Sequence, residues 1–402
     1  MSAPLAGIRV LDLSWVMVGP FSARYLADLG ADVVKVESSS RIDPLRTLGP
    51  FKDGIPGPER SVSYHNLNAG KRSITLDLKS EAGRAVALKL TAWADIVLES
   101  FTPRVLRNMR LAYDDLRTVR PDLIMVSTSI AGQTGPYASD LMGVGTMGAA
   151  LSGATFLIGW PDRPPVGPFG PWTDEVTPRF IVSSLLAALH RRRRTGEGCY
   201  IDIAQAEAGM QFISPAAWEF TANGVIPQRQ GSGSRLRCPF GSYPGADTDG
   251  WVVIDASGPA HWERLRALVG GGLLDSRYET LIGRLRHRQP LDAEVSRWTS
   301  QRSAQDNEHI LQAAGVPAHA AVRAAALATD PDLRAAGHLQ PIDDPVIGDA
   351  EIEGPRFAIA PSSLHPVRRG PLIGEHTYEV LRECAGLSDE DIASLGEAGA
   401  IA

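Results

Sequence analysis

Short apolar runs alternate with amphipathic stretches through the first third of the chain. The run IRVLDL at 8–13 has strand length, GPFSARYLADLG at 19–30 has helical spacing and ends on a glycine, and ADVVKVE at 31–37 is a second strand-like run. A strand, a helix and a strand in this order form a βαβ unit, and such units build parallel sheets. The fold class expected is α/β, with a Rossmann-like parallel sheet in a large domain.

The same alternation continues beyond the first unit. It predicts strands at SITLDL, DIVLES and LIMVSTS, a helix over 80–94 and a short helix from 114. A longer helix is expected over 175–194, because arginines fill its last turn and Thr195-Gly196 follows as a stop signal. A further strand and helix are expected in YIDIAQAEAGMQFISPAAWEFTANG.

The pattern changes in the second half, where a Gly/Ser/Pro-rich segment at 228–250 indicates a domain boundary. A smaller α/β unit is expected from WVVIDA to about residue 324, and two helical runs close the chain. The predicted organisation is a large domain over 1–200, a linker over 201–227, a small inserted domain over 228–325, and a linker with a return to the large domain over 326–402.

The composition is typical of a soluble globular protein and argues against several other classes of protein. The chain has 402 residues, 44% hydrophobic and 21% charged, which suits two globular domains. A formal charge of -6 argues against a nucleic-acid partner, and three scattered cysteines form neither a disulfide framework nor a zinc pattern. With no signal peptide and no apolar run long enough to span a membrane, we expect a soluble cytoplasmic protein without a membrane partner.

Several common sites are disfavoured by their motifs. The first strand–loop–helix carries only Gly19-Pro20, where a nicotinamide site needs G-x-G-x-x-G. The nine histidines show no metal spacing, and GSGSR at 231–235 has the wrong order for a serine hydrolase. We expect no metal and no covalently bound cofactor.

Asp174 lies between a Pro/Gly-rich loop and an apolar helical run. As the N-cap of that helix it would accept backbone N–H bonds of the first turn. As a catalytic carboxylate it would use the same amides to stabilise developing charge. The local pattern alone favours the N-cap, and both interpretations can hold together.

The motifs together resemble one family. LAGIRVLDLSWVMVGPFSARYLADLGADVVKVE, NAGKRSITLDLKSEAG, ADIVLESFTPRVL, AGQTGPYASD, DEVT, ALHRRRRTGEGCYIDIAQAEA and PLIGEHTYEVL are similar, in order, to blocks of the class III CoA-transferases. This is the group of formyl-CoA transferase and carnitine CoA-transferase. The resemblance extends from about residue 4 to 395 and implies an interlocked homodimer.

The resemblance also implies a reaction. Asp174 would attack a donor acyl-CoA, and CoA would pass to an acceptor carboxylic acid through aspartyl anhydride and aspartyl-CoA thioester intermediates. CoA thioesters are then substrates. The positions matching the family's CoA contacts are Val16, Met17, Val18, Leu76, Asp77, Leu78, Lys79, Ser100, Phe101, Thr102 and Arg104. Gly231, Ser232, Gly233 and Ser234 partly match a glycine-rich substrate loop that covers the aspartate.

Several residues depart from the family pattern, and they leave other substrates and other functions open. Ser38 and Asn108 stand where formyl-CoA transferase has arginines, which favours another acyl group. An α-methylacyl-CoA racemase would need a histidine where this chain has Gly143-Val144-Gly145. A non-catalytic CoA-binding subunit of a hetero-oligomer is the third interpretation, although such a subunit should have lost its acid.

Overall fold

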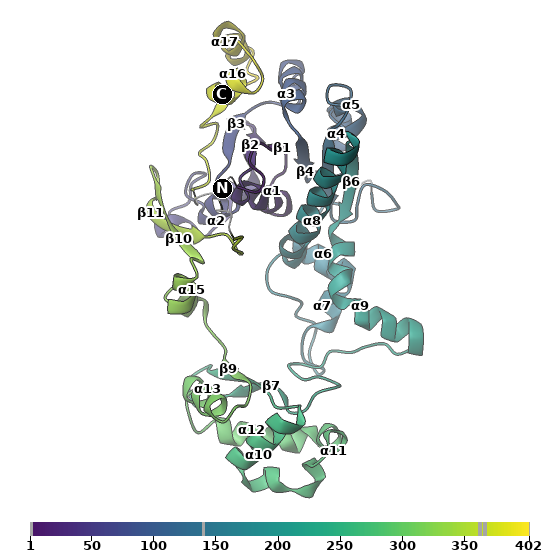
Figure 1. Cartoon of the computed structure of the whole chain (residues 1–402), viewed down its shortest axis with the longest axis vertical. Helices are drawn as coiled ribbons and strands as arrows, with labels where there is room; N and C mark the ends of the chain where they lie inside the picture. Colours follow the sequence, from purple (N-terminus) through teal and green to yellow (C-terminus); the bar gives the residue numbers. More distant parts are fainter. Residues whose placement is uncertain (1–2, 139–140, 361–363, 365–367, 402) are drawn as a thin grey trace. The chain divides into compact units, whose positions relative to one another are not determined.

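The computed structural model describes residues 3–138, 141–360, 364 and 368–401, and the chain divides into two units (Figure 1). Unit 1 comprises Met1–Ala154, Pro168–Trp218 and Pro331–Ala402. Unit 2 comprises Thr155–Gly167 and Glu219–Asp330. The chain therefore leaves unit 1 twice and returns to it for its last segment.

Six parallel strands form the sheet of unit 1. The strand order is β3-β2-β1-β4-β5-β6, which is the order of doubly wound dinucleotide-binding folds. The α/β, Rossmann-like fold predicted from the apolar runs is confirmed. The strands are β1 (Arg9–Asp12), β2 (Asp32–Glu37), β3 (Arg72–Thr75), β4 (Ile96–Glu99), β5 (Ile124–Ser129) and β6 (Cys199–Ala204).

Helices cover both faces of this sheet because its strands are apolar on both sides. Val10 belongs to a core shared with helices α1 (Val18–Asp28) and α8 (Trp172–Thr195). Leu11, the next residue, belongs to the core on the opposite face. That second core includes α3 (Glu81–Trp93), α16 (Thr377–Glu383) and α17 (Asp389–Glu397), so the C-terminal segment completes unit 1.

Shorter elements connect these layers. In the N-terminal part they are the 3-10 turns η1 (Pro44–Thr47) and η2 (Lys52–Gly54) and the helices α2 (Val62–Leu67), α4 (Val105–Asn108), α5 (Tyr113–Leu116) and α6 (Gly145–Ser152). Two helices run from one unit into the other, α7 (Ala154–Leu157) and α9 (Gln205–Asn223). Near the C-terminus, unit 1 also holds α15 (Pro331–Ala335) and the hairpin of β10 (Leu339–Asp344) and β11 (Gly348–Glu353).

Unit 2 has its own antiparallel sheet, in the order β7-β8-β9, and its own core around the fully buried Trp262. Its strands are β7 (Phe240–Pro244), β8 (Trp251–Asp255) and β9 (Ala318–Ala320). Its helical elements are α10 (Pro259–Val269), η3 (Gly271–Leu274), η4 (Ser276–Tyr278), α11 (Leu281–Arg286), α12 (Arg288–Thr299), α13 (Ala304–Ala313) and α14 (Ala324–Leu327).

Candidate active site

The strand order of unit 1 places a switch point between β1 and β4, where the chain reverses its direction of winding. In open parallel sheets, ligands bind outside the carboxyl ends of the strands at such a point. The segment Val16–Val18 follows β1, and Ser100–Thr102 follows β4. Two of the three segments predicted to contact CoA therefore lie at the position that the topology favours for a ligand.

Side-chain contacts join these two segments. The Ser100 hydroxyl lies 3.0 Å from the backbone nitrogen of Trp15, which donates to it, and 3.1 Å from the Trp15 carbonyl oxygen, to which it donates. The rings of Trp15 and Phe101 meet edge to face, with centroids 5.4 Å apart. The guanidinium group of Arg41 lies 5.6 Å from the Trp15 ring centroid. An apolar surface with a cation beside it thus stands at the switch point.

Val16 adopts a φ of +67°, which is unusual for a β-branched residue and strains the backbone. Its N–H donates to Asp43 Oδ1 at 2.9 Å. Asp43 is in turn held by Lys35, whose buried ammonium group donates to Asp43 Oδ2 at 2.9 Å and to the Ser14 carbonyl at 2.8 Å. The carboxylate keeps the pKa of Lys35 above its ordinary value despite burial, so the ion pair fixes the strained loop.

The third predicted CoA segment, Leu76–Lys79, follows β3 and begins with a buried leucine. Asp77 accepts the Lys79 N–H at 3.1 Å, which turns the chain into α3. Leu78 and Lys79 then line a cleft of about 300 Å³. Its other lining residues are Ser80, Glu81, Arg84, Asn108, Met109 and Arg110.

The cleft also contains Asn108. By the resemblance stated above, this asparagine stands where formyl-CoA transferase has an arginine that contacts CoA, so the position itself supplies no positive charge. Arg84, from α3, and Arg110, just after α4, line the same cleft and supply positive charge. Arg104, predicted as a contact, is exposed at the start of α4 and does not line the cleft. The sequence did not indicate Arg84 and Arg110 as CoA contacts, because no motif or fixed spacing connects the two arginines.

Asp174 does not cap its own helix. Helix α8 begins at Trp172, three residues before the predicted start, with Pro171 as its N-cap residue and no side-chain capping bond. Asp174 is therefore the third residue of α8, and it is buried. Its Oδ2 accepts the backbone N–H of Gly145, the first residue of α6, at 3.0 Å. The carboxylate thus binds the N-terminus of a neighbouring helix.

The close approach of the two helices requires glycine at 145. A Cβ atom there would lie 2.2 Å from the Pro171 carbonyl oxygen and 2.7 Å from the Asp174 nitrogen. At Gly148 a Cβ would lie 2.1 Å from the Thr173 hydroxyl oxygen. Gly145 and Gly148 are therefore the positions that let α6 approach α8 closely enough to donate an N–H to Asp174.

Gln205, directly after β6, completes the surroundings of Asp174. Its Oε1 accepts the Thr173 hydroxyl at 2.9 Å, which leaves its amide nitrogen to donate to Asp174. The N–H of Ala206 donates to the carbonyl of Ile130, just beyond β5. Asp174 therefore lies at the carboxyl ends of β5 and β6, on the same edge of the sheet as the switch point.

Burial raises the pKa of Asp174 to about 6, and the charge of neighbouring Glu175 adds to this effect. The hydrogen bonds from Gly145 and Gln205 oppose it without cancelling it. Among the described residues, no cation forms an ion pair with Asp174. The group is a carboxylate at neutral pH that is poorly solvated and only partly stabilised, which favours reaction at its oxygen.

A second buried carboxyl group, Glu99, ends β4 beside this site. Burial raises its pKa to about 7. The N–H of Phe101 donates to it at 2.8 Å, so Glu99 holds the turn that presents Ser100 and Phe101.

The family model of CoA-transferase family III matches residues 5–377, which include the three predicted CoA segments and Asp174. The chain belongs to CoA-transferase family III. The resemblance stated from the motifs is confirmed.

Relatives of this family III CoA-transferase align over almost its whole length. The succinyl-CoA–D-citramalate CoA-transferase of Chloroflexus aurantiacus is 33% identical over 98% of this chain and 96% of the relative. The succinate–glutarate CoA-transferase of Agrobacterium fabrum is 33% identical over 94% of this chain and 95% of the relative. A solved CaiB/BaiF family protein from Brucella suis is 31% identical with a TM-score of 0.85, and the match covers 96% of this chain and 100% of that one.

The predicted substrate loop of the enzyme lies in unit 2 and is tightly packed. A Cβ atom at Gly231 would lie 2.4 Å from the Trp160 ring, and one at Gly233 would lie 2.3 Å from a guanidinium nitrogen of Arg288. Ser232 accepts the N–H of Ser242 at 3.2 Å, and the Ser234 carbonyl accepts from Arg288. Gly231, which also has a φ of +61°, is therefore needed for the close approach to Trp160, whereas the flexible Arg288 side chain could move away from a larger residue at 233.

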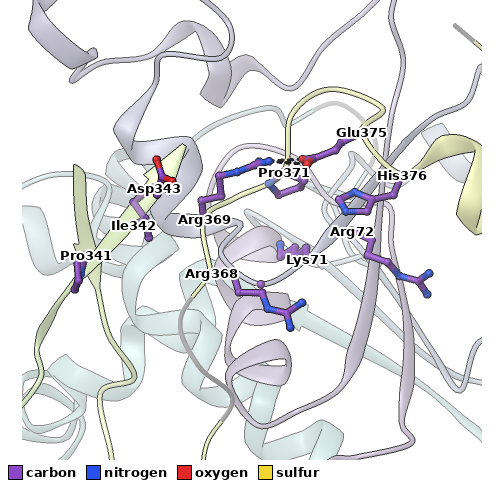
Figure 2. Close-up of a pocket in the computed structure, with 11 residues that line it drawn as sticks. Lys71, Arg72, Pro341, Ile342, Asp343, Arg368, Arg369, Pro371, Glu375 and His376 are labelled. Atoms are coloured by element: carbon purple, nitrogen blue, oxygen red, sulfur yellow. Dashed lines mark hydrogen bonds and ion pairs between the residues drawn. The ribbon is translucent and has the colours of Figure 1, made fainter. Parts of the chain in front are cut away.

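A separate cavity of about 390 Å³ lies at the amino end of β3 in the CoA-transferase and differs in character (Figure 2). Lys71 donates to Asp12 at 2.8 Å, and Arg72 pairs with Asp32 at 2.6 Å. Figure 2 shows Arg369 paired with Glu375, at 2.5 Å. The charges of Lys71, Arg72 and Arg369 are already neutralised within the protein, which argues for a structural role of these three residues.

Two kinds of feature are absent from the described part of the chain. No group of three or more His, Cys, Asp or Glu residues there could hold a metal ion. No described helix is both long enough and apolar enough to cross a membrane.

Proposed function

We propose that this CoA-transferase moves CoA from an acyl-CoA donor to an acceptor carboxylate with Asp174 as the nucleophile. The observation that carries the proposal is a buried carboxylate with a raised pKa and no ion-pair partner among the described residues, facing the N-terminus of α6. The N–H of Gly145 can stabilise the negative charge on the aspartyl oxygen when a tetrahedral intermediate forms at the aspartyl carbon, in the second and third steps below.

In the proposed mechanism, an Asp174 oxygen attacks the thioester carbonyl, the C–S bond breaks, and CoA leaves as a thiolate. The thiolate attacks the aspartyl carbonyl of the resulting anhydride, which releases the donor acid and forms an aspartyl-CoA thioester. The acceptor carboxylate attacks that thioester, giving a second anhydride and free thiolate. Attack of the thiolate on the acceptor carbonyl then yields the new acyl-CoA and restores Asp174.

CoA itself is proposed to bind along the carboxyl edge of the sheet. Val16–Val18 and Ser100–Thr102 stand at the switch point, and the cleft of Lys79, Arg84 and Arg110 carries the positive charge that phosphates require. These residues remain predictions as CoA contacts, as do Arg104 and the loop 231–234.

The proposed substrates are short dicarboxylic acids. The two relatives named above act, by their names, on succinyl-CoA with D-citramalate and on succinate with glutarate. The racemase alternative is disfavoured because residues 143–145 carry no histidine and a side chain at 145 would clash.

We also propose that the enzyme forms a homodimer and that units 1 and 2 are its large and small domains. Phe212 of α9 contacts the rings of Trp172 and Phe180 on α8, yet Phe212 and Phe180 remain exposed, as do Leu186 and Met210. Exposed large apolar side chains on two helices that contact each other are typical of a protein interface. Light scattering should give twice the mass of one chain.

The proposal is tested by incubating the protein with succinyl-CoA and glutarate, and following glutaryl-CoA by chromatography. Wild type should transfer CoA, and Asp174→Ala should lose the activity by at least about 10³-fold. Equal rates for the two proteins would refute the role of Asp174. Exchange of the α-proton of a 2-methylacyl-CoA without any acceptor acid would favour the racemase instead.

A further inference from the structure

Gln205 is a buried amide that contacts Asp174 within unit 1. It follows β6 directly and is the first residue of α9. The N–H of Ala206, the next residue, donates to the Ile130 carbonyl at 2.9 Å, so the backbone that carries Gln205 is tied to the end of β5. A buried amide needs partners for its donor and for its acceptor, and both are present here.

The two partners fix the orientation of the amide. A carboxylate only accepts hydrogen bonds, so the amide nitrogen of Gln205 faces Asp174 and its Oε1 faces Thr173. The Thr173 hydroxyl lies 2.9 Å from this Oε1 and 3.0 Å from the Gly145 carbonyl oxygen, and it can donate to either. Thr173 thus connects Gln205 to the same helix terminus whose N–H binds Asp174.

Neutral donors alone balance the charge of Asp174. Among the described residues, no cation pairs with it, and α6 carries no titratable side chain. The charged residues of the neighbouring elements, Glu175 and Arg179 on α8, Glu207 on α9 and Asp202 on β6, are all exposed. The charge of Glu175 disfavours ionisation of Asp174, as burial does. Only the helix N–H and the amide oppose these two effects.

We propose that Gln205 is a positioning residue that keeps Asp174 ionised and oriented at neutral pH. A hydrogen bond to the charged form of a carboxyl group favours ionisation. A neutral amide lowers the pKa of that group by less than a cation would, so the oxygen keeps more of its basicity. The consequence for the reaction rests on the proposed function, whereas the effect on ionisation can be measured without it.

The test replaces the amide by a thioether of similar length. Gln205→Met removes the donor, and the Thr173 hydroxyl keeps the Gly145 carbonyl as its acceptor. The inflection in the pH profile of kcat/KM, expected at about 6, should rise by about one pH unit. Transfer from succinyl-CoA to glutarate should fall about tenfold below pH 6 and return to within about threefold of wild type at pH 8. KM for succinyl-CoA at pH 8 should not change.

Two further variants make the profile decisive. Gln211→Met, at an exposed glutamine of the same helix, is the matched control and should reproduce the wild-type profile. Gln205→Glu places a second carboxyl group beside Asp174, and the pair should titrate with one apparent pKa raised further than in Gln205→Met. A merely structural role would lower the rate of Gln205→Met equally at every pH. That result, or an unchanged profile, would refute the proposed role of Gln205.

A second readout does not depend on turnover. Infrared spectroscopy follows the band of the protonated Asp174 carboxyl group, which is identified by its absence from Asp174→Asn. The band should titrate near pH 6 in wild type and Gln211→Met, and about one unit higher in Gln205→Met. If this shift occurs but wild type transfers no CoA, the proposed function fails and the effect of Gln205 stands. If wild type transfers CoA but the band of Gln205→Met titrates as in wild type, the effect of Gln205 is refuted and the proposed function stands.

Discussion

Glu37 and Asp174 are both buried carboxyl groups of unit 1, yet their environments shift their pKa values in opposite directions. Arg46 donates to Glu37 at 2.9 Å and 2.8 Å, and the Tyr64 hydroxyl donates at 2.7 Å, so the pKa of Glu37 falls to about 2 although burial opposes this. Asp174 has no such cation in the part of the chain that the structure describes, and its pKa rises to about 6. Burial is common to both groups, so the counter-ion distinguishes a structural carboxylate from one available for chemistry.

The largest expected effect is that of Asp174→Asn. Transfer should fall by at least about 10³-fold, because an amide cannot form the anhydride. The free energy of unfolding should rise by up to about 3 kcal/mol at pH 7, because a pKa raised by about two units disfavours the ionised folded state. Urea denaturation at pH 7 and pH 4 checks this. The gain should be present at pH 7 and nearly absent at pH 4, and a loss of stability at pH 7 would contradict the account.

The same amide substitution at Glu37 should have the opposite effect on stability. Glu37→Gln leaves the buried guanidinium group of Arg46 without its main partner, which should cost about 3–5 kcal/mol. Because the folded pKa of Glu37 is lowered, its stabilisation exists above the unfolded pKa and is lost as pH falls towards 2. Denaturation at pH 7 measures the loss. A Glu37→Gln protein as stable as wild type would contradict the opposite effects on stability that we expect for Glu37 and Asp174.

The pH dependence of transfer should follow the ionisation of Asp174. Only the carboxylate is nucleophilic, so kcat/KM should fall about tenfold per pH unit below an apparent pKa of about 6. Initial rates between pH 4.5 and 8 provide the profile, with unfolding monitored at each pH. A flat profile down to pH 5 would show that Asp174 has an ordinary pKa or does not limit the reaction.

The smallest expected effect concerns the cleft beside Lys79. Arg84→Gln and Arg110→Gln should each raise KM for succinyl-CoA by about three- to tenfold and leave kcat nearly unchanged, since each removes one proposed phosphate partner from a solvent-open cleft. Lys89→Gln, an exposed cation on the same helix as Arg84, is the control. An equal change in the control would show that only the general surface charge matters.

The sequence predicted the sheet well because its signal is local. Runs such as ADVVKVE alternate between two cores, so period and length alone identify β2. The motifs also placed Asp174 in a family pattern. The arrangement around it could not be predicted, because Gly145 and Gln205 reach Asp174 from positions 29 residues before it and 31 residues after it. Those contacts depend on how α6, α8 and β6 pack.

The N-cap interpretation of Asp174 failed for a related reason. A carboxyl group near a helix start can bind its own helix or a neighbouring one, and the local pattern does not distinguish them. The structure shows the neighbouring helix, because glycines at 145 and 148 let α6 approach α8 closely.

Acceptance of the acyl group by Asp174 is the step on which the proposed function depends. Mass spectrometry of the protein quenched after brief exposure to succinyl-CoA tests it most directly. We expect a covalent adduct on the peptide that contains Asp174 in wild type and none in Asp174→Asn. An adduct on another residue, or normal transfer by Asp174→Asn, would contradict it.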